Sequence, residues 1–241
     1  MPTPYNLDVH DDCSECSVRH ERMFCNLDAE TLKVLDGIKF TGMYPKGSML
    51  FVEGENPRGV FILCSGRAKL TTSSTEGKTL IVKIADAGEV LGASSTILGR
   101  PHEVSAETIE PSQLNFIKRE DFLKFLSMNV DVCIHTAQQL SEKYQAAQRD
   151  LRSLGLSQTT SVRLARLLLE WAASRGEETP KGVRISLLFT HEEVAQMIGT
   201  TRETITRILS TFRKKGLIEM KGATLVILDK KALETLTGIC T

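Results

Sequence analysis

The sequence predicts an α+β protein in which an N-terminal antiparallel β-roll is followed by a long helix and a C-terminal winged helix-turn-helix. Three patterns predict this class. Short strand-like runs broken by glycine span residues 40–117, an apolar heptad repeat spans 133–154, and two capped amphipathic segments with a hairpin pattern span 189–227. The expected domains are a cysteine-containing segment, the β-roll, the long helix and the winged domain, with boundaries at 1–26, 27–120, 121–155 and 156–241.

The composition is that of an ordinary globular chain. Of the 241 residues, 41% are hydrophobic and 25% are charged, which suits two domains with cores of their own. The sequence has no apolar run of membrane-spanning length and no signal-peptide pattern, so we expect a cytoplasmic protein without a membrane partner. Gly77-Lys78-Thr79 lacks the earlier glycine of a phosphate-binding loop, because position 72 is threonine. With no other catalytic motif present, we do not expect an enzyme.

Residues 27–120 begin with a short helix and continue as strands. The helix is expected over residues 27–38, with Asp28 as its cap and leucines on its apolar face. Glycines then recur at intervals of 12, 11 and 11 residues, at Gly54, Gly66, Gly77 and Gly88. Strand-like runs occupy residues 60–63, 68–70, 80–84 and 114–117. Short strands with turns at this spacing predict an antiparallel sandwich or barrel.

Residues 121–155 are expected to form a helix that pairs with a second copy of the chain. Its apolar positions are separated by 4, 3, 4, 3, 4 and 3 residues, as in the seam of a coiled coil. This seam consists of Cys133, Ala137, Leu140, Tyr144, Ala147, Leu151 and Leu154. A parallel two-stranded coiled coil, and hence a homodimer, is the predicted use of the seam. The alternative is that the helix packs the same stripe on its own β-roll.

Two short helices joined by a tight turn are expected after a hinge at residues 153–161 and an amphipathic helix at 162–173. Thr190 and Glu193 form a capping-box pattern that begins the first helix, and Gly199 supplies the turn. A second capping-box pattern, Thr200 with Glu203, begins the second helix. The buried face of the second helix is expected to consist of Ile205, Ile208, Leu209 and Phe212. Strand-like runs on either side of Lys221-Gly222 then predict a β-hairpin wing.

The other face of the second helix predicts contact with double-stranded DNA. In a helix-turn-helix, the N-terminal residues of the second helix reach base edges in the major groove. Arginine can bond guanine at two atoms, and glutamate can accept from the cytosine amine, so Arg202, Glu203 and Arg207 are expected to read bases. The full set of expected DNA contacts is Arg202, Glu203, Thr206, Arg207, Thr190, Thr201, Lys214 and Lys221.

The distribution of charge agrees with a polyanionic partner at the C-terminal side. The net charge is zero, but residues 156–241 hold 13 Lys and Arg against 9 Asp and Glu, and residues 1–155 hold 17 against 21. The two parts therefore carry +4 and −4. An excess of basic side chains on one small winged module is typical of a surface that binds the phosphate backbone.

Residues 200–222, TTRETITRILSTFRKKGLIEMKG, resemble the C-terminal winged helix-turn-helix of the CRP/FNR transcription regulators. The resemblance extends over about residues 24–236, and the turns at 45–47 and 88–92 resemble those of the cyclic-nucleotide-binding β-roll. It implies a homodimer that reads a palindrome with half-sites about one helical turn, ~34 Å, apart, with RNA polymerase as a further partner. Arg202 matches the CRP-like residue, which implies a half-site resembling TGTGA. The alternative of another class is an effector-binding module whose winged domain contacts only protein.

Cyclic AMP is not expected in the β-roll. In relatives that bind it, a glutamate contacts the ribose and an Arg-Ser pair holds the phosphate. Ala93 stands at the glutamate position here, and Glu103-Val104-Ser105 falls where the Arg-Ser pair is expected. A carboxylate at that place would repel the phosphate, and an unpaired buried phosphate is costly.

Three cysteines before the first helix are candidate metal ligands. Cys13, Cys16 and Cys25 precede the helix as the cluster-binding cysteines do in FNR, which implies an iron–sulfur cluster and a response to oxygen or redox state. The gap before Cys25 is longer than in FNR, and Asn115 stands where FNR has its fourth cysteine. The fourth ligand is left open among His20, Cys64, Asp11, Asp12 or none.

The same cysteines allow other interpretations. Together with His20 they have a zinc-knuckle-like spacing, C-x2-C-x3-H-x4-C, which suits a Cys3His zinc site. A metal-free thiol switch and three cysteines without a function are the remaining alternatives. Cys64 and Cys133 are expected to be packing residues, and Cys240 lies in the C-terminal tail.

Overall fold

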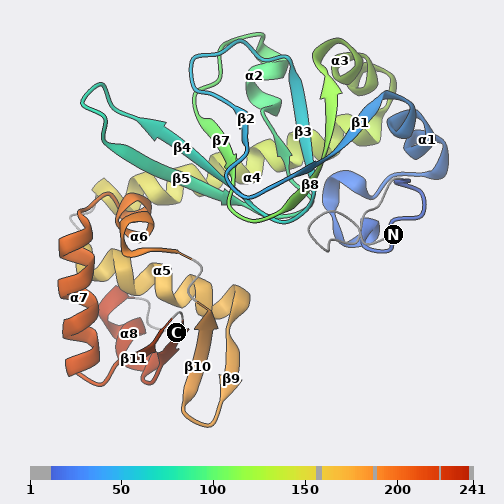
Figure 1. The fold of residues 1–241 in the computed structure, drawn as a ribbon. Helices are drawn as coiled ribbons and strands as arrows, with labels where there is room; N and C mark the ends of the chain where they lie inside the picture. Colours follow the sequence, from blue (N-terminus) through green and yellow to red (C-terminus); the bar gives the residue numbers. More distant parts are fainter. Residues whose placement is uncertain (1–11, 156–158, 187–188, 223, 239–241) are drawn as a thin grey trace. The chain divides into compact units, whose positions relative to one another are not determined.

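The computed structural model confirms the α+β class and the order of β-roll, long helix and winged helix-turn-helix (Figure 1). Its contacts divide the chain into two compact units, residues 1–147 and 148–241. The boundary falls inside the long helix, so most of that helix belongs to the first unit. The structure describes residues 12–155, 159–186, 189–222 and 224–238.

The first unit is a roll of two antiparallel sheets with four strands each. The strand orders are β1-β8-β3-β6 and β2-β7-β4-β5. The strands are β1 (Lys39–Tyr44), β2 (Met49–Phe51), β3 (Gly59–Ser65), β4 (Ala68–Ser73), β5 (Thr79–Ala85), β6 (Val90–Leu91), β7 (Ser105–Thr108) and β8 (Ser112–Lys118). Leu63, Leu91 and Leu114 of the first sheet pack against Ala106 and other small residues of the second. The residues at 77–79 form the hairpin turn between β4 and β5, so they are not a phosphate loop.

Helices cover the outer face of the sheet that contains β1, β8 and β3. Helix α1 (Ala29–Ile38) begins at Asp28, whose carboxylate accepts from the backbone N–H groups of Glu30 and Thr31, as predicted. Helix α3 (Arg119–Met128) and the start of α4 (Val130–Gly155) pack beside it, and a short helix α2 (Ala93–Leu98) follows β6. The buried side chains of this outer core are Phe24, Leu27, Leu32, Leu35, Val60, Ile62, Val90, Ala93, Ile117, Phe122, Phe125 and Val132.

The prediction of one helix over residues 121–155 is wrong at Asn129. The Asn129 backbone is extended, with φ −130° and ψ 105°, and this residue separates α3 from α4. The Asn129 side chain donates to the carbonyl oxygen of Phe125 at 2.9 Å, which satisfies one carbonyl at the end of α3. Asparagine favours such local bonds over continued helix, which accounts for the break.

Helix α4 has two different faces in the first unit. Val132, Thr136 and Gln139 are buried against the roll, at helical spacing. The seam lies on another face: Cys133, Ala137, Tyr144 and Ala147 are exposed and Leu140 is half-buried. The seam therefore does not pack on the roll over its described part, which removes the predicted alternative there. The side chains of Leu151 and Leu154 lie outside the described residues.

The turn at residues 88–92 is held by α4. The Gln139 side chain accepts from the Val90 N–H at 2.8 Å, and Lys143 Nζ donates to the Val90 carbonyl oxygen at 2.9 Å. Glu89 lies between two lysines, 2.5 Å from Lys83 and 3.9 Å from Lys143. The Arg22 side chain covers the same turn from the N-terminal segment: a Cβ added at Gly88, where φ is +98°, would lie 3.0 Å from Arg22 Cγ.

We predict that Lys143 titrates well below the other lysines. Burial lowers the pKa of Lys143 to about 8, although nearby Glu89 opposes the shift. Between about pH 8 and the ordinary value of 10.5, the unfolded chain keeps this proton and the folded chain releases it. Lys143 therefore makes the free energy of unfolding rise with pH across that window, by at most about 3 kcal/mol at ~1.4 kcal/mol per pKa unit.

The measurement is a 13C NMR titration of the lysine Cε signals between pH 6 and 12. Lys143→Arg identifies the signal, because it removes that lysine and keeps a basic side chain. A midpoint near pH 8 is the expected result. A midpoint above pH 10 would contradict it.

The second unit is the winged domain. Its helices are α5 (Thr160–Arg175), α6 (His191–Ile198), α7 (Arg202–Lys214) and α8 (Lys230–Thr237). A sheet in the order β11-β12-β10-β9 contains β9 (Glu177–Thr179), β10 (Gly182–Ser186), β11 (Ile218–Lys221) and β12 (Thr224–Ile227). The predicted wing, β11 with β12, is present, whereas β9, β10 and α8 were not predicted. Part of the predicted hinge, residues 156–158, lies outside the described residues.

In the part of the chain that the structure describes, no helix combines the length and the apolar character needed to cross a membrane.

Candidate functional site

The helix pair α6–α7 is built by local caps. Thr190 and Glu193 form the predicted capping box: the Glu193 carboxylate accepts from the Thr190 N–H at 2.9 Å, and Thr190 Oγ1 accepts from the Glu193 N–H at 3.2 Å. Gly199 ends α6 in the left-handed conformation, with φ 65°. Only glycine adopts this conformation at little cost, so Gly199 fixes the turn between the two helices.

The predicted cap of α7 is wrong by one residue. Thr201, not Thr200, is the N-cap, and its hydroxyl accepts from the Thr204 N–H at 3.3 Å. The helix therefore begins at Arg202. The pKa of Glu203 lies below its ordinary value because its carboxylate is close to its own backbone N–H and to the Thr201 hydroxyl. Glu203 is exposed in the first turn of α7. The helix dipole favours a negative charge there as well.

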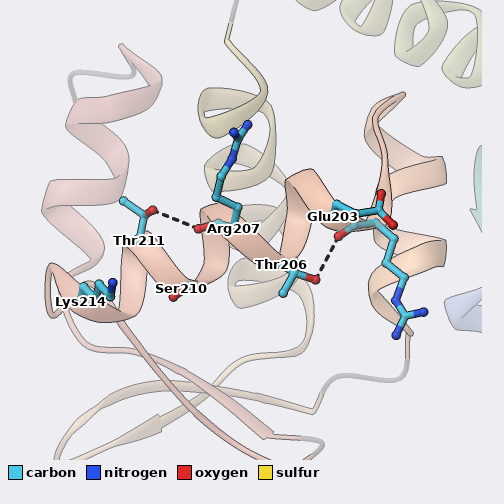
Figure 2. Close-up of a pocket in the computed structure, with 7 residues that line it drawn as sticks. Glu203, Thr206, Arg207, Ser210, Thr211 and Lys214 are labelled. Atoms are coloured by element: carbon cyan, nitrogen blue, oxygen red, sulfur yellow. Dashed lines mark hydrogen bonds between the residues drawn. The ribbon is translucent and has the colours of Figure 1, made fainter.

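Helix α7 separates an apolar face from a polar one. All four predicted core residues, Ile205, Ile208, Leu209 and Phe212, are buried. Figure 2 shows the opposite face, where polar and charged side chains extend from successive turns of the helix. A shallow groove on this face is lined by Arg202, Glu203, Thr206, Arg207, Ser210, Thr211 and Lys214.

The groove contains five of the eight residues predicted to contact DNA. Thr190 and Thr201 are outside it because they cap α6 and α7, and Lys221 is outside it because it ends β11. All eight DNA contacts, inside the groove and outside it, stay predictions. Ser210 and Thr211 were not predicted. The sequence could have identified both, because they follow Thr206 and Arg207 by four residues and so lie on the same helical face.

Hydroxyl groups in the groove are oriented by the helix itself. Thr206 Oγ1 donates to the Arg202 carbonyl oxygen and Thr211 Oγ1 to that of Arg207, each at 3.0 Å (Figure 2). His191, at the start of α6, was also missed: its Nδ1 lies 3.0 Å from Thr206 Oγ1. Thr206 therefore has polar contacts with both helices of the motif.

The groove is electrostatically suited to a polyanion. Arg202, Arg207 and Lys214 are exposed, and no salt bridge is recorded for them among the described residues. Within the described chain, Arg213 and Lys215 at the C-terminal end of the helix likewise form no salt bridge. Cations without intramolecular partners can neutralise phosphates without first breaking an ion pair.

The β-roll differs from a cyclic-nucleotide site at the positions named from the sequence. Ala93 is buried at the first position of α2 and offers no carboxylate. Glu103 is exposed, and Ser105 Oγ already accepts from the Glu53 N–H at 2.9 Å. The pair that would hold a cyclic phosphate is thus replaced by an acidic residue and an occupied hydroxyl.

The cysteine cluster lies against the roll, beside β1 and β8. Cys13 Sγ is 3.1 Å from Lys39 Nζ and 3.8 Å from Asn115 Nδ2, while Cys13 and Cys25 pack on the outer core. Burial raises the pKa of Cys13 to about 11 and that of Cys25 to about 12, so both are neutral thiols near pH 7. Cys16, the third predicted cysteine, is half-buried in the same N-terminal segment.

Two other predicted ligands are occupied elsewhere. The His20 ring is exposed, with Nδ1 3.2 Å from Asn26 Oδ1 and Nε2 3.2 Å from Arg19 Nε. The Asp12 carboxylate accepts from the backbone and hydroxyl of Ser14. Asp11 and Cys240 lie outside the described residues. Within the described ranges, no three Cys, His, Asp or Glu side chains converge closely enough to hold a metal ion as they stand.

Comparisons with known proteins match both units. Residues 42–129 match the cyclic nucleotide-binding domain family and residues 162–236 the Crp-like helix-turn-helix domain family. The CRP-like cAMP-activated global transcriptional regulator of Mycobacterium tuberculosis is 25% identical over 190 residues, which are 79% of this chain and 84% of that protein. Electron transport regulator A of Shewanella oneidensis is 27% identical over 227 residues, 94% of this chain and 90% of that protein.

The fold agrees with solved structures as well. The c-di-GMP responsive global regulator CLP of Xanthomonas campestris has a TM-score of 0.75 at 21% identity, over 84% of this chain and all of that one (100%). A β-roll followed by a long helix and a Crp-like helix-turn-helix with an exposed basic groove is the architecture of a DNA-binding regulator. The chain therefore belongs to the CRP/FNR family of transcription regulators, which bind DNA and are not enzymes.

Proposed function

We propose that the protein acts in the cytoplasm as a homodimer that places α7 of each copy in the major groove of a palindromic site and regulates transcription in response to redox state. The groove along α7 is the observation on which this proposal rests. It joins Arg202, Glu203 and Arg207 within the first two turns, all exposed. An arginine fork and a carboxylate side by side can distinguish G·C pairs by their donors and acceptors.

The half-site follows from these side chains. Each of the two arginines can bond O6 and N7 of a guanine, and Glu203 can accept from the N4 amine of a cytosine on the opposite strand. Thr206 lies between them and adjusts one further position. Two guanines near one cytosine of the other strand agree with a TGTGA-like half-site. Lys214 then binds phosphate at the C-terminal end of the helix, since it lines the same groove three turns away.

The dimer is supported by the free face of α4. Tyr144 has 65% of its surface exposed, and Ile134 beside the seam 48%, although both are large apolar side chains. Large exposed apolar side chains along one helix indicate a partner surface. A second copy of the seam provides such a surface, because each heptad position meets its equivalent across a twofold axis. RNA polymerase is the further partner that a transcription regulator of this type would contact.

The signal is proposed to enter through Cys13, Cys16 and Cys25. Cys13 Sγ contacts Lys39 on β1 and Asn115 on β8, so a change at this sulfur would act on both strands. Thiolates at this spacing suit an iron–sulfur cluster, which supplies redox and oxygen chemistry when bound. A structural zinc ion on the same sulfurs is the second candidate, since zinc also prefers thiolates.

A binding selection with random DNA tests the proposal. The native protein is expected to enrich palindromes with TGTGA-like half-sites centred about one helical turn apart. Affinity for the enriched site should fall steeply with salt, with a slope of about −0.9 per phosphate contacted in a plot of log affinity against log salt. The control is a duplex of the same length with scrambled half-sites. No enrichment and no salt dependence would instead favour an effector-binding module whose winged domain contacts protein.

A further inference from the structure

We propose that His191 at the start of α6 positions Thr206 of α7 so that the methyl group of Thr206, and not its hydroxyl, meets the DNA and selects a thymine. His191 is then a positioning residue, and Thr206 determines specificity at one base pair. The inference rests on the proposed binding of α7 in the major groove, and it names the base and the group that reads it.

Thr206 lies in the middle of the polar face of α7. It follows Arg202 by four residues and Glu203 by three, and Ser210 follows it by four, so these side chains are neighbours on the helix surface. All of them line the shallow groove, in which Thr206 is exposed (Figure 2). Its short side chain brings only two groups to this groove, a hydroxyl and a methyl group.

The hydroxyl of Thr206 has already used its hydrogen. Oγ1 donates to the carbonyl oxygen of Arg202, one turn back, at 3.0 Å (Figure 2). A hydroxyl has one hydrogen and two lone pairs, so towards any other partner Thr206 can only accept. The hydroxyl therefore cannot donate to O6 or N7 of guanine, to N7 of adenine or to O4 of thymine.

The same reasoning assigns a proton on the His191 ring. Nδ1 of His191 lies 3.0 Å from Thr206 Oγ1, and because Oγ1 must accept in this contact, Nδ1 is the donor. A neutral ring is thus held in its Nδ1–H form, and a charged ring keeps the same donor. Thr206 Oγ1 is consequently bonded on two sides, by the backbone of α7 and by a ring from α6.

The contact with His191 selects one side-chain conformation of Thr206. In helices threonine divides between two χ1 rotamers, which place the hydroxyl and the methyl group differently. Only a rotamer that turns Oγ1 towards α6 can accept from His191 while it donates to Arg202. The methyl group is then the part of the side chain that is left for the groove. Without the ring, both rotamers would be populated and the DNA would meet a mixture of the two.

A methyl group on the reading surface matches one base. Thymine alone carries a C5-methyl group on its major-groove edge, and threonine methyl groups form apolar contacts with it. Burial of one methyl group against another removes both from water, which is worth about fourfold in affinity. The TGTGA-like half-site contains thymine next to guanine, so a thymine falls beside the bases proposed for Arg202 and Arg207.

The remaining polar option is an amine of adenine or cytosine. Oγ1 of Thr206 keeps one lone pair, which can accept from N6 of adenine or N4 of cytosine. The Arg202 carbonyl oxygen and His191 Nδ1 each lie 3.0 Å from Oγ1, so an amine would approach an oxygen that is flanked on two sides. The methyl group is bonded to neither partner, which favours thymine.

The test removes one methyl group from each partner. Each thymine of the selected site is replaced in turn by uracil, which lacks only the C5-methyl group, and affinities are measured for native protein and Thr206→Ser. At one position uracil is expected to cost native protein about fourfold in affinity, whereas Thr206→Ser should bind both duplexes alike. A thymine-to-uracil affinity ratio of one at every position for native protein would overturn the proposal, as would a native ratio in Thr206→Ser.

The role of His191 is measured with the same ratio. His191→Ala is expected to reduce it from about fourfold to less than about twofold, because Thr206 then occupies both rotamers. His191→Asn should restore it, since the asparagine amide places an N–H donor where Nδ1 lies. Glu192→Gln is the matched control: this neighbour is exposed on α6 outside the groove, and its loss should leave the ratio unchanged. A native ratio in His191→Ala would refute the positioning by His191.

Two further readouts separate misfolding and failure of the proposed function. Thermal midpoints and circular dichroism should agree between native protein and each variant; if His191→Ala is less stable, His191→Gln takes its place, because its amide lies one carbon farther out and should not restore the ratio. If no palindrome is selected, the proposed function and this inference fail together. A native protein that binds the selected site through Arg207, but does not distinguish thymine from uracil, overturns this inference alone.

Discussion

Replacing Arg207 with alanine is expected to weaken binding to the selected site by roughly 5- to 150-fold, equivalent to about 1–3 kcal/mol, and to relax the preference for one guanine. Arg207 is exposed on the groove of α7, with no salt bridge recorded for it among the described residues. Its removal therefore leaves the fold unchanged and deletes only contacts made to DNA. Binding isotherms on the selected site and on its three variants at that base pair measure both effects.

A matched control is Arg184→Ala in the same domain. Arg184 lies on β10 and pairs with Glu177, outside the groove. Its loss should change site affinity less than twofold and leave the base preference intact, because an exposed pair contributes less than about 1 kcal/mol. If Arg207→Ala bound every variant of the site as the native protein does, α7 would not be the reading helix.

Replacing Gly182 with alanine is expected to destabilise the winged domain by about 2–5 kcal/mol. Gly182 begins β10 with φ +131°, outside the range that side-chain-bearing residues adopt readily. A Cβ there would lie 2.0 Å from the carbonyl oxygen of Ile227, in the adjacent strand β12. Backbone strain and a steric clash with backbone atoms add to each other, because neither strand can move without breaking the ladder.

Trp171 gives a specific signal for this measurement. It is the single tryptophan of the chain and stacks on Phe189, with ring centroids 5.4 Å apart, so its fluorescence reports on this unit during urea unfolding. Gly216→Ala is the control, since Gly216 also has positive φ, +69°, but an added Cβ would meet nothing within 4 Å. It should cost only ~1–2 kcal/mol. Equal urea midpoints for the two variants would show that the backbone at Ile227 moves away from the added Cβ at little cost, which would contradict the prediction.

The elements with strong local signals were predictable from the sequence. The Thr190 capping box, the Gly199 turn and the apolar spacing of α7 each depend on neighbours within a few residues. The wrong N-cap of α7 has the same origin. Two adjacent threonines can each cap a helix, and the backbone conformation decides which of them does so. The short strand β9 and the helix α8 were missed because three and eight residues provide too few repeats for a period to be recognised.

Features that depend on tertiary register could not be predicted in the same way. Cys13 and Cys64 are 51 positions apart, and both pack on the outer core because the N-terminal segment folds against it. The sequence therefore offered Cys64 only as one fourth ligand among several. The division of α4 into a roll-facing stripe and a free seam also required the structure, because polar Thr136 and Gln139 do not look like core residues.

The turn at residues 88–92 is contacted both by the cysteine-containing segment and by helix α4. Arg22 covers Gly88, and Gln139 and Lys143 of α4 hold Val90 of the same turn. Any coupling free energy that passes through a common element acts equally in both directions. Suppose that metal binding or oxidation at the cysteine sulfurs changes the constant with which α4 associates with a second copy. Association must then change metal binding or oxidation at the sulfurs by the same factor. The sensing threshold would then vary with the cellular concentration of the regulator itself.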